Sequence, residues 1–474
     1  MGLRSRRPAL PSLLAFFFGT ALILGAAVCP GPARAVAPRA DLAAQPVQIR
    51  YKGTLWYEGH YRRPHEVRTY NSEAIYTADG RGRARLDWTT WRDTDSTRVP
   101  ESFLVEGDSV FHRNDPTSPW QLLAGEARRL GRLQVVAGIA SELGRLARSQ
   151  PKSAGSEFMF DGPRFLYTER LAHPRLGDVI DSVAYTFAKS DPIPREALVV
   201  IHERDAEFRL IQQRVGQPRG DFPESLLQSP ASFEPPPADV DLLVGEPKIV
   251  AVAPGLWALD MEDIDSRSMI VEFDKYLAVI EMAVGSANGE RIVDAARQRW
   301  PGKPIRYAFF SHHHPHYLGG VRAMIAEGAT VVTTPGNEAY IREISTLIFE
   351  TKPDRLALKP QRGQVRTFAD RYELADSTNQ LVAINYGERS QHTDEFVLFW
   401  FPRAKVLFES EQGWVRVNGK TRASSRAAKL LEWLREEKLD VDRIVQSWPM
   451  KDNDMSVTRA DLEAMVKASA TAKR

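Results

Sequence analysis

The pattern of apolar and polar positions divides the chain into stretches of different character. From residue 47 to about 122, apolar and polar side chains alternate, with turn signals such as Asp79-Gly80 between the alternating runs. A period of two predicts half-buried strands. Residues 124–149 change to helical spacing. The apolar face of this predicted helix is formed by Leu130, Leu133, Val136, Ile139, Leu143 and Leu146.

Alternating runs resume near residue 164 and continue to about 215. The simplest architecture for this part is an antiparallel sheet with a packed helix. A polar, proline-rich stretch follows and ends in Pro235-Pro236-Pro237, which is typical of a linker. We therefore predict a β-rich domain over residues 44–216, a linker over 217–247 and a second domain over 248–467.

The predicted second domain is built from short buried strands and helices in two similar halves. Turns at residues 274–275 and 402–404 lie between apolar runs and predict hairpins. Each hairpin is followed by a helical pattern, at 289–300 and 426–437, and then by a further buried strand. Two such halves predict a mixed α/β domain in which two sheets pack face to face with helices outside.

The first 35 residues have the features of a secretory signal. Arginines between residues 4 and 7 precede an apolar run, Leu13 to Val28, which is short for a transmembrane helix. Ala33-Arg34-Ala35 supplies a small-x-small cleavage pattern. We predict a periplasmic or secreted protein with no stable membrane span after cleavage. The alternatives are a retained N-terminal anchor and a lipid-modified Cys29, although Val28 before it is a poor fit to the small residue that such sites need.

Charge and cysteine content narrow the classes of partner. The net charge is +2, and it becomes −2 without the four arginines of residues 1–35. This charge balance gives no electrostatic basis for binding nucleic acid or an anionic membrane. We expect the partner to be a small-molecule substrate or ligand. The oligomeric state does not follow from the sequence. The only cysteine, Cys29, precedes the predicted cleavage, so any metal must be held by histidine and oxygen.

Four of the ten histidines lie between residues 312 and 316, where a buried strand gives way to a loop. In an extended segment residues two apart point the same way, so His312, His314 and His316 would share one side. We expect the segment to stay extended here because Pro315 disfavours a helix. Clustered histidines at a strand end predict a metal site.

A third metal ligand has to come from elsewhere in the chain. His392 lies in a polar loop before the second hairpin, at a position that corresponds to the first site in the repeat. Three neutral imidazoles leave zinc its full charge, which lowers the pKa of a bound water to about 7. The pattern therefore predicts zinc-dependent hydrolysis by an activated water.

The order of these motifs resembles the metallo-β-lactamase superfamily of metal-dependent hydrolases. Ser311-His312-His313-His314 is followed by Gly319-Gly320, and His392-Thr393-Asp394-Glu395 precedes the strand pair around 401–408. The resemblance covers residues 248–467 and implies a helix–sheet–sheet–helix sandwich with the metal at one sheet edge. It also implies that His312, His314 and His392 are ligands of the first metal.

Departures from the family motif concern the second metal. His316 stands at the aspartate of the motif and Tyr317 at its final histidine, while Trp448 replaces a later histidine. Glu411 matches the acid that bridges two metals. We therefore predict one zinc ion, with His316 and Glu411 as catalytic candidates, because a neutral imidazole can accept a proton and a carboxylate can orient a water. The alternatives are that His316 is a ligand of the first metal and that Glu411 binds metal. Tyr317 and Trp448 are expected to be apolar fill.

Three interpretations of the function stay open at this point. One is an exported zinc hydrolase of unknown substrate, favoured by the three histidines. Another is a non-catalytic relative that acts as a periplasmic binding or envelope-associated protein, favoured by the altered second-metal positions. A carrier of lipid or envelope components is a third interpretation, based on the first sheet and the signal.

Overall fold

The computed structural model describes residues 45–149, 156–161, 164–188, 191, 193–203, 206–236, 243–413, 424–450 and 454–471. The predicted signal segment, with Cys29, lies outside these residues. Leu42–Arg474 forms one compact unit, so the boundary between two domains stays a prediction. Among the residues just given, no helix combines the length and apolar character needed to cross a membrane.

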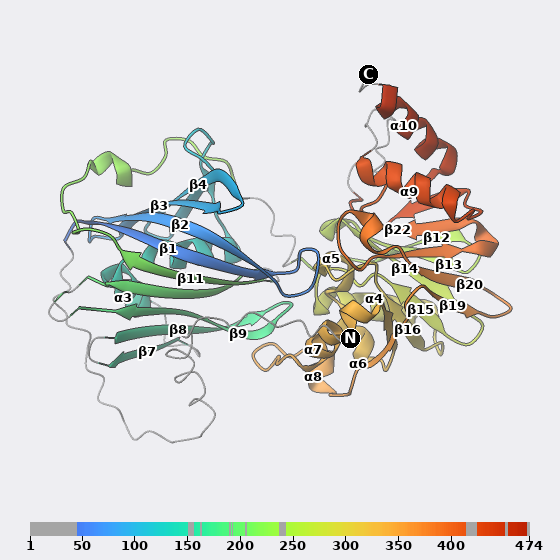
Figure 1. Cartoon of the computed structure of the whole chain (residues 1–474). Coiled ribbons are helices and arrows are strands. Elements are labelled where there is room, and N and C mark those ends of the chain that lie inside the picture. Colours follow the sequence, from blue (N-terminus) through green and yellow to red (C-terminus); the bar gives the residue numbers. More distant parts are fainter. Residues whose placement is uncertain are drawn as a thin grey trace, which may run out of the picture. The chain divides into compact units, whose positions relative to one another are not determined.

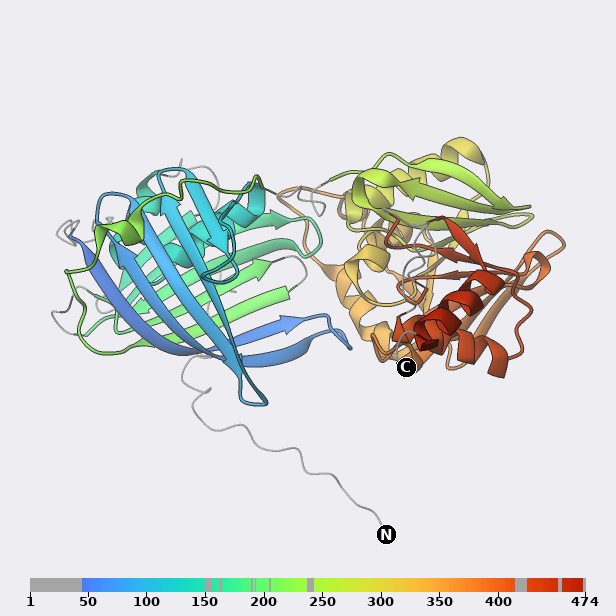
Figure 2. The ribbon, with the colours of Figure 1, turned by 90° about the horizontal axis from the view of Figure 1, so that it is seen from above.

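The first half folds into one antiparallel sheet of eleven strands, in the order β6-β5-β4-β3-β2-β1-β11-β10-β9-β8-β7. The sheet curves strongly, as the blue to green strands in Figure 2 show. This confirms the prediction from alternating side chains. Its strands are β1 Val47–Gly59, β2 Glu66–Ala78, β3 Arg83–Arg92, β4 Asp95–Glu106, β5 Ser109–Arg113, β6 Gln121–Leu122, β7 Ser156–Asp161, β8 Arg164–His173, β9 Gly177–Thr186, β10 Glu196–Glu203 and β11 Ala206–Arg214.

The predicted single helix over 124–149 is wrong, because two helices occur, α2 Gly125–Val136 and α3 Ala140–Ser149. The break falls at Gly138, where a Cβ atom would lie 2.4 Å from the ring of Tyr76. The Tyr51 hydroxyl also donates a hydrogen bond to the Gly138 carbonyl, at 3.2 Å. Close packing of these aromatic rings therefore ends one helix before the next begins. The described residues of the predicted apolar face, such as Leu143, are buried in the core.

The second half contains two further sheets (Figure 1). The seven-stranded sheet follows chain order: β12 Lys248–Ala253, β13 Leu256–Met261, β14 Ser266–Glu272, β15 Leu277–Ile280, β16 Ile305–Phe309, β17 Thr330–Thr333 and β18 Gln364–Thr367. The six-stranded sheet does the same: β19 Arg371–Ala375, β20 Gln380–Asn385, β21 Val397–Phe401, β22 Val406–Glu409, β23 Arg443–Gln446 and β24 Ser456–Thr458.

Four layers result from the way these sheets and their helices bury apolar side chains. One core lies between the sheets, where the rings of Phe309 and Phe399 are 6.0 Å apart. A second core joins the other face of the seven-stranded sheet to its helices. A third core joins the six-stranded sheet to α9 and α10. The predicted arrangement of helices outside two sheets is confirmed. The helices are α4 Ser286–Arg299, α5 Pro315–Leu318, α6 Val321–Ala326, α7 Glu338–Thr346, α8 Arg355–Leu358, α9 Ser425–Glu436 and α10 Arg459–Thr471.

One edge of this sandwich gathers three loops. The first follows β16, the second connects β20 to β21, and the third follows β22. β16 pairs in parallel with β15 and β17, and its position between them explains the burial of Ile305, Ala308 and Phe309. The backbone N–H of Val397 donates to the Ser311 carbonyl at 2.7 Å, which ties the first loop to the start of β21. The candidate site residues His312, His314, His392 and Glu411 lie in these three loops.

Candidate metal centre

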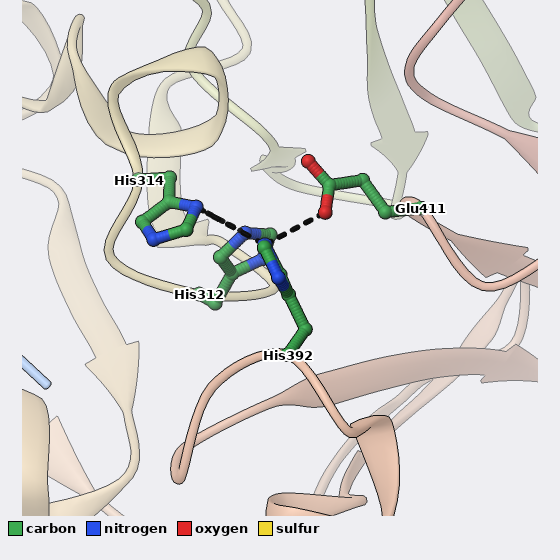
Figure 3. A group of neighbouring side chains, drawn as sticks. All are labelled: His312, His314, His392 and Glu411. Atoms are coloured by element: carbon green, nitrogen blue, oxygen red, sulfur yellow. Dashed lines mark hydrogen bonds and ion pairs between the residues drawn. The ribbon is translucent and has the colours of Figure 1, made fainter. Parts of the chain in front are cut away.

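Three histidines and one glutamate converge at this edge. The potential ligand atoms of His312, His314, His392 and Glu411 all lie within 4.8 Å of one another. Figure 3 shows the side chains turned toward a common point. Nδ1 of His314 is 3.2 Å from Nε2 of His312 and 3.1 Å from Nε2 of His392. Ligands at about 2.05 Å from a tetrahedral zinc ion are about 3.3 Å apart, so these nitrogens fit zinc in identity and spacing.

The histidine stretch does not stay extended to its end. Pro315 begins the short helix α5 as its first residue, a position where its missing N–H is not needed. The expectation that proline keeps this segment extended is therefore wrong. His316 follows Pro315 in α5, and its ring packs 5.1 Å from that of Trp448. His316 therefore lies outside the group of four converging side chains.

Buried polar groups contact His312 and the residue before it. Its Nδ1 lies 3.0 Å from the Ser311 hydroxyl, which accepts a hydrogen bond from Ser410 at 2.6 Å. The Ser311 backbone N–H donates to Glu281 at 3.2 Å. Burial raises the pKa of Glu281 to about 8, so this carboxyl group is mostly protonated at neutral pH. Glu281 thus supports the backbone before His312 without adding charge to the centre.

The protonation of His314 is fixed by its partner. Its Nε2 lies 2.9 Å from the backbone carbonyl of Tyr61, which can only accept. The proton therefore sits on Nε2, and Nδ1 keeps the lone pair that faces the other histidines. Burial, followed by the charge of His392, lowers the pKa of His314 to about 4. A neutral ring with a free inward nitrogen is the form that binds metal.

Glu411 is engaged at both oxygens. Oε1 accepts from the Tyr317 hydroxyl at 2.9 Å, and Oε2 accepts from Arg426 at 3.1 Å. Oε2 also lies 2.7 Å from Nε2 of His392. Burial opposes ionisation, but the hydrogen bond and charge of His392 outweigh it and lower the pKa of Glu411 to about 2. Glu411 is therefore an anion beside the histidines.

Tyr317 corrects one expectation. It is fully buried, as apolar fill would be, but its hydroxyl orients the glutamate and its ring lies 4.2 Å from that of His312. Trp448 is partly buried and packs against the core between the seven-stranded sheet and its helices, as expected for apolar fill.

Two groups at the centre were not singled out by the sequence, Arg426 and the carbonyl of Tyr61. The guanidinium of Arg426 donates to Nδ1 of His392 at 3.0 Å as well as to Glu411. In the sequence Arg426 is only the start of a helical pattern, and a backbone carbonyl has no sequence signal. Neither group could have been found without the tertiary structure.

The backbone is strained where these side chains are aimed. Gln391, which precedes His392, has φ 56°, and Glu411 itself has φ 56°. Left-handed conformations cost non-glycine residues on the order of 1–2 kcal/mol. The surrounding contacts have to maintain both conformations, because each directs a member of the cluster inward.

Several other histidines lie outside the cluster. His313 is buried outside the cluster, with its ring 6.1 Å from that of His60. His60 and His65 have polar partners, and so does His202. These three histidines are therefore held by polar partners outside the cluster.

Comparison with known proteins gives matches to solved structures alone. No protein-family model matches the sequence, and no curated protein matches it. A metallo-beta-lactamase from Pontibacter korlensis is 17% identical, with 47% of this chain and 99% of that chain covered and a TM-score of 0.35. FIM-1 from Pseudomonas aeruginosa, in its mono-zinc form, is 16% identical, with coverage of 49% and 98% and a TM-score of 0.32.

A third similar structure is Pisa1, an inverting sec-alkylsulfatase from a Pseudomonas species. It is 14% identical, with 46% of this chain and 40% of that chain covered and a TM-score of 0.33. About half of the present chain is thus similar to metallo-β-lactamase structures, at low sequence identity.

Proposed function

We propose that this protein is an exported hydrolase that uses one zinc ion held by His312, His314 and His392. The observation that carries the proposal is the convergence of three imidazole nitrogens at distances that fit a tetrahedral zinc site. The tautomer of His314 supports it, since the Tyr61 carbonyl leaves the inward nitrogen unprotonated.

The position of Glu411 decides between a closed structural site and an open catalytic one. Four protein ligands would close a tetrahedral site, whereas catalytic zinc sites keep one position for water or substrate. Both oxygens of Glu411 already accept hydrogen bonds, from Tyr317 and Arg426. We therefore assign Glu411 to orienting the reactants beside the metal, and leave the fourth position open.

The same contacts favour one metal over two. The glutamate matched to the bridging acid is held by a phenol and a guanidinium, and the positive charge of Arg426 lies beside it. A second cation would have to displace that charge. Zinc, when bound, would supply Lewis-acid activation of a water and of the scissile bond. The chain's own residues would orient that chemistry, with Glu411 held beside the metal by Tyr317 and Arg426.

The test is the zinc content of the purified protein. We expect about one zinc per chain in the wild type and its loss in His312→Ala. His313→Asn is the matched control, because His313 is an adjacent buried histidine outside the cluster. Absence of zinc from the wild type after reconstitution would overturn the proposal. Glu411→Gln should keep the zinc and lose turnover; loss of the zinc as well would make Glu411 a fourth ligand.

Substrate class is the next measurement. We propose a small molecule with a hydrolysable ester, lactone, phosphodiester or β-lactam bond, tested as a panel on the zinc-loaded protein. Failure of every member with zinc present would favour the alternative function, a periplasmic binding or envelope-associated protein. Export is part of the proposal and is checked by locating the mature chain after cell fractionation.

A further inference from the structure

The loop between β1 and β2, residues 60–65, lies against the metal centre. The Tyr61 carbonyl accepts the Nε2–H of His314 at 2.9 Å, across 253 positions of sequence. Partners of this kind fix the tautomer and orientation of a ligating histidine. One outer partner of the site is therefore provided by the eleven-stranded sheet rather than by the sandwich.

The same loop holds the segment that carries His392. The backbone N–H of Asp394 donates to the Arg62 carbonyl at 2.9 Å. The Asp394 carboxylate accepts from Nε of Arg62 at 2.7 Å and also from Nε of Arg63. Asp394 lies two residues after His392, so these bonds restrain the loop at its base.

Contacts with α7 position the ends of the 60–65 loop. Nε2 of His60 lies 3.1 Å from the Tyr340 hydroxyl, and the two rings are 4.5 Å apart. At the other end, Nε2 of His65 is 2.8 Å from the Glu343 carboxylate. The loop is thus bound at both ends and at its centre.

We propose that the 60–65 loop is a positioning element of the metal centre, in which the Tyr61 carbonyl orients His314 and the Asp394 contacts orient His392. This inference rests on the proposed zinc site. It gives the first sheet a definite role, because without the loop two of the three ligands lose the partners that aim them. Loss of such outer partners typically weakens metal binding by about 10–100-fold.

The expected effect on folding is much smaller, which makes the two effects separable. Arg62 and Arg63 are about half and nearly three-quarters exposed, at 51% and 72%. Exposed ion pairs contribute about 0–1 kcal/mol to stability. A loop variant should therefore stay folded while its zinc affinity falls.

The experiment replaces residues 60–65 with Asn-Gly in the full chain. Gly59 and Glu66 are already paired across the strands, so a two-residue turn preserves the register of β1 and β2. A second variant, Asp394→Asn, weakens the contact without changing the loop length. Arg371→Ala is the control, since it removes an ion pair of similar exposure, with Glu437.

Zinc affinity is measured by competition with a chelator, and the cobalt absorption spectrum reports the ligand geometry. We expect zinc binding to weaken at least tenfold in the turn variant, less in Asp394→Asn, and not at all in Arg371→Ala. Tyr61→Ala should also bind normally, because it retains the carbonyl. Folding of the metal-free variants is followed by urea unfolding.

The outcomes separate the inference from the proposed function. Normal zinc affinity in both the turn variant and Asp394→Asn, with zinc bound by the wild type, would overturn the inference alone. Absence of zinc from the wild type would overturn both. If the turn variant does not fold, Asp394→Asn decides the question, and an unchanged affinity there counts against the loop.

Discussion

The histidines of the metal centre and His202 of the first sheet occupy polar clusters of opposite character. At the centre, His314 is surrounded mainly by other imidazoles, and burial and the His392 charge lower its pKa to about 4. His202 lies 3.1 Å from Asp181 and 3.4 Å from Glu207. Burial alone would lower the pKa of His202, but the hydrogen bonds to these carboxylates raise it to about 9.

The comparison shows that neighbours decide what a buried histidine can do. A neutral imidazole offers a lone pair to a metal, whereas a protonated one offers only donors. The cluster around His202 also includes Arg129, which donates to Asp181 at 2.7 Å and to Glu169 at 3.1 Å. Each donor there has an acceptor, so that cluster is a closed structural network.

The largest expected effect on stability comes from a substitution that disrupts this structural network. Asp181 is fully buried and accepts from both Arg129 and His202, so Asp181→Asn removes the buried negative charge that these two groups share. We expect the free energy of unfolding to fall by about 3–5 kcal/mol, as measured by urea titration at pH 7. Asp108→Asn, at a fully exposed carboxylate, is the control and should change it by less than about 0.5 kcal/mol. A similar loss in both variants would contradict the assignment.

Zinc should stabilise the folded protein only by binding at the metal centre. At a free zinc concentration of 100 times the dissociation constant, the unfolding free energy should rise by about 2.7 kcal/mol. The increment should vanish in His392→Ala and remain in His202→Gln, because the two histidines belong to independent clusters. Thermal unfolding with and without zinc measures it. An equal increment in His392→Ala would place the binding site elsewhere.

A pH effect distinguishes the two clusters next. The pKa of His202 is raised in the folded state, so its stabilisation is fully present below the unfolded value of about 6.5. It is lost as the pH rises through about 9. We expect the stability difference between wild type and His202→Gln to shrink by about 2–3 kcal/mol over that window. Urea unfolding at pH 6 and pH 9.5 checks this, and a constant difference would rule it out.

The smallest effect concerns Arg426. Its donation to Nδ1 of His392 requires the ring proton to sit on Nε2, the nitrogen that faces the other ligands. Metal binding at Nε2 needs the proton on Nδ1, so the guanidinium contact has to break. Arg426→Ala should therefore bind zinc about tenfold more tightly, since a charge-assisted hydrogen bond contributes about 1.5 kcal/mol. Chelator competition measures it, with Arg371→Ala as control. Weaker binding would mean that Arg426 supports the ligand set.

The sequence was informative wherever side-chain periodicity reflects burial. The alternation in strands such as β1 and β9 predicted the antiparallel sheet, and the apolar run of β16 predicted a buried strand. Local rules failed where packing from another element intervened. Tyr76 divides the predicted helix at Gly138, and Pro315 starts a helix that the sequence argued against.

The composition of the metal centre could be derived from the chain's residues without any coordinates: imidazoles after a buried strand, a further histidine in a matching loop, and no cysteine among residues 45–471. The environment of these side chains depended on tertiary contacts. Those contacts placed the Tyr61 carbonyl on His314, Arg426 on His392, and His316 outside the cluster. The physical reason is that ligand identity is a property of side chains, whereas tautomer, charge and orientation depend on partners that are remote in sequence.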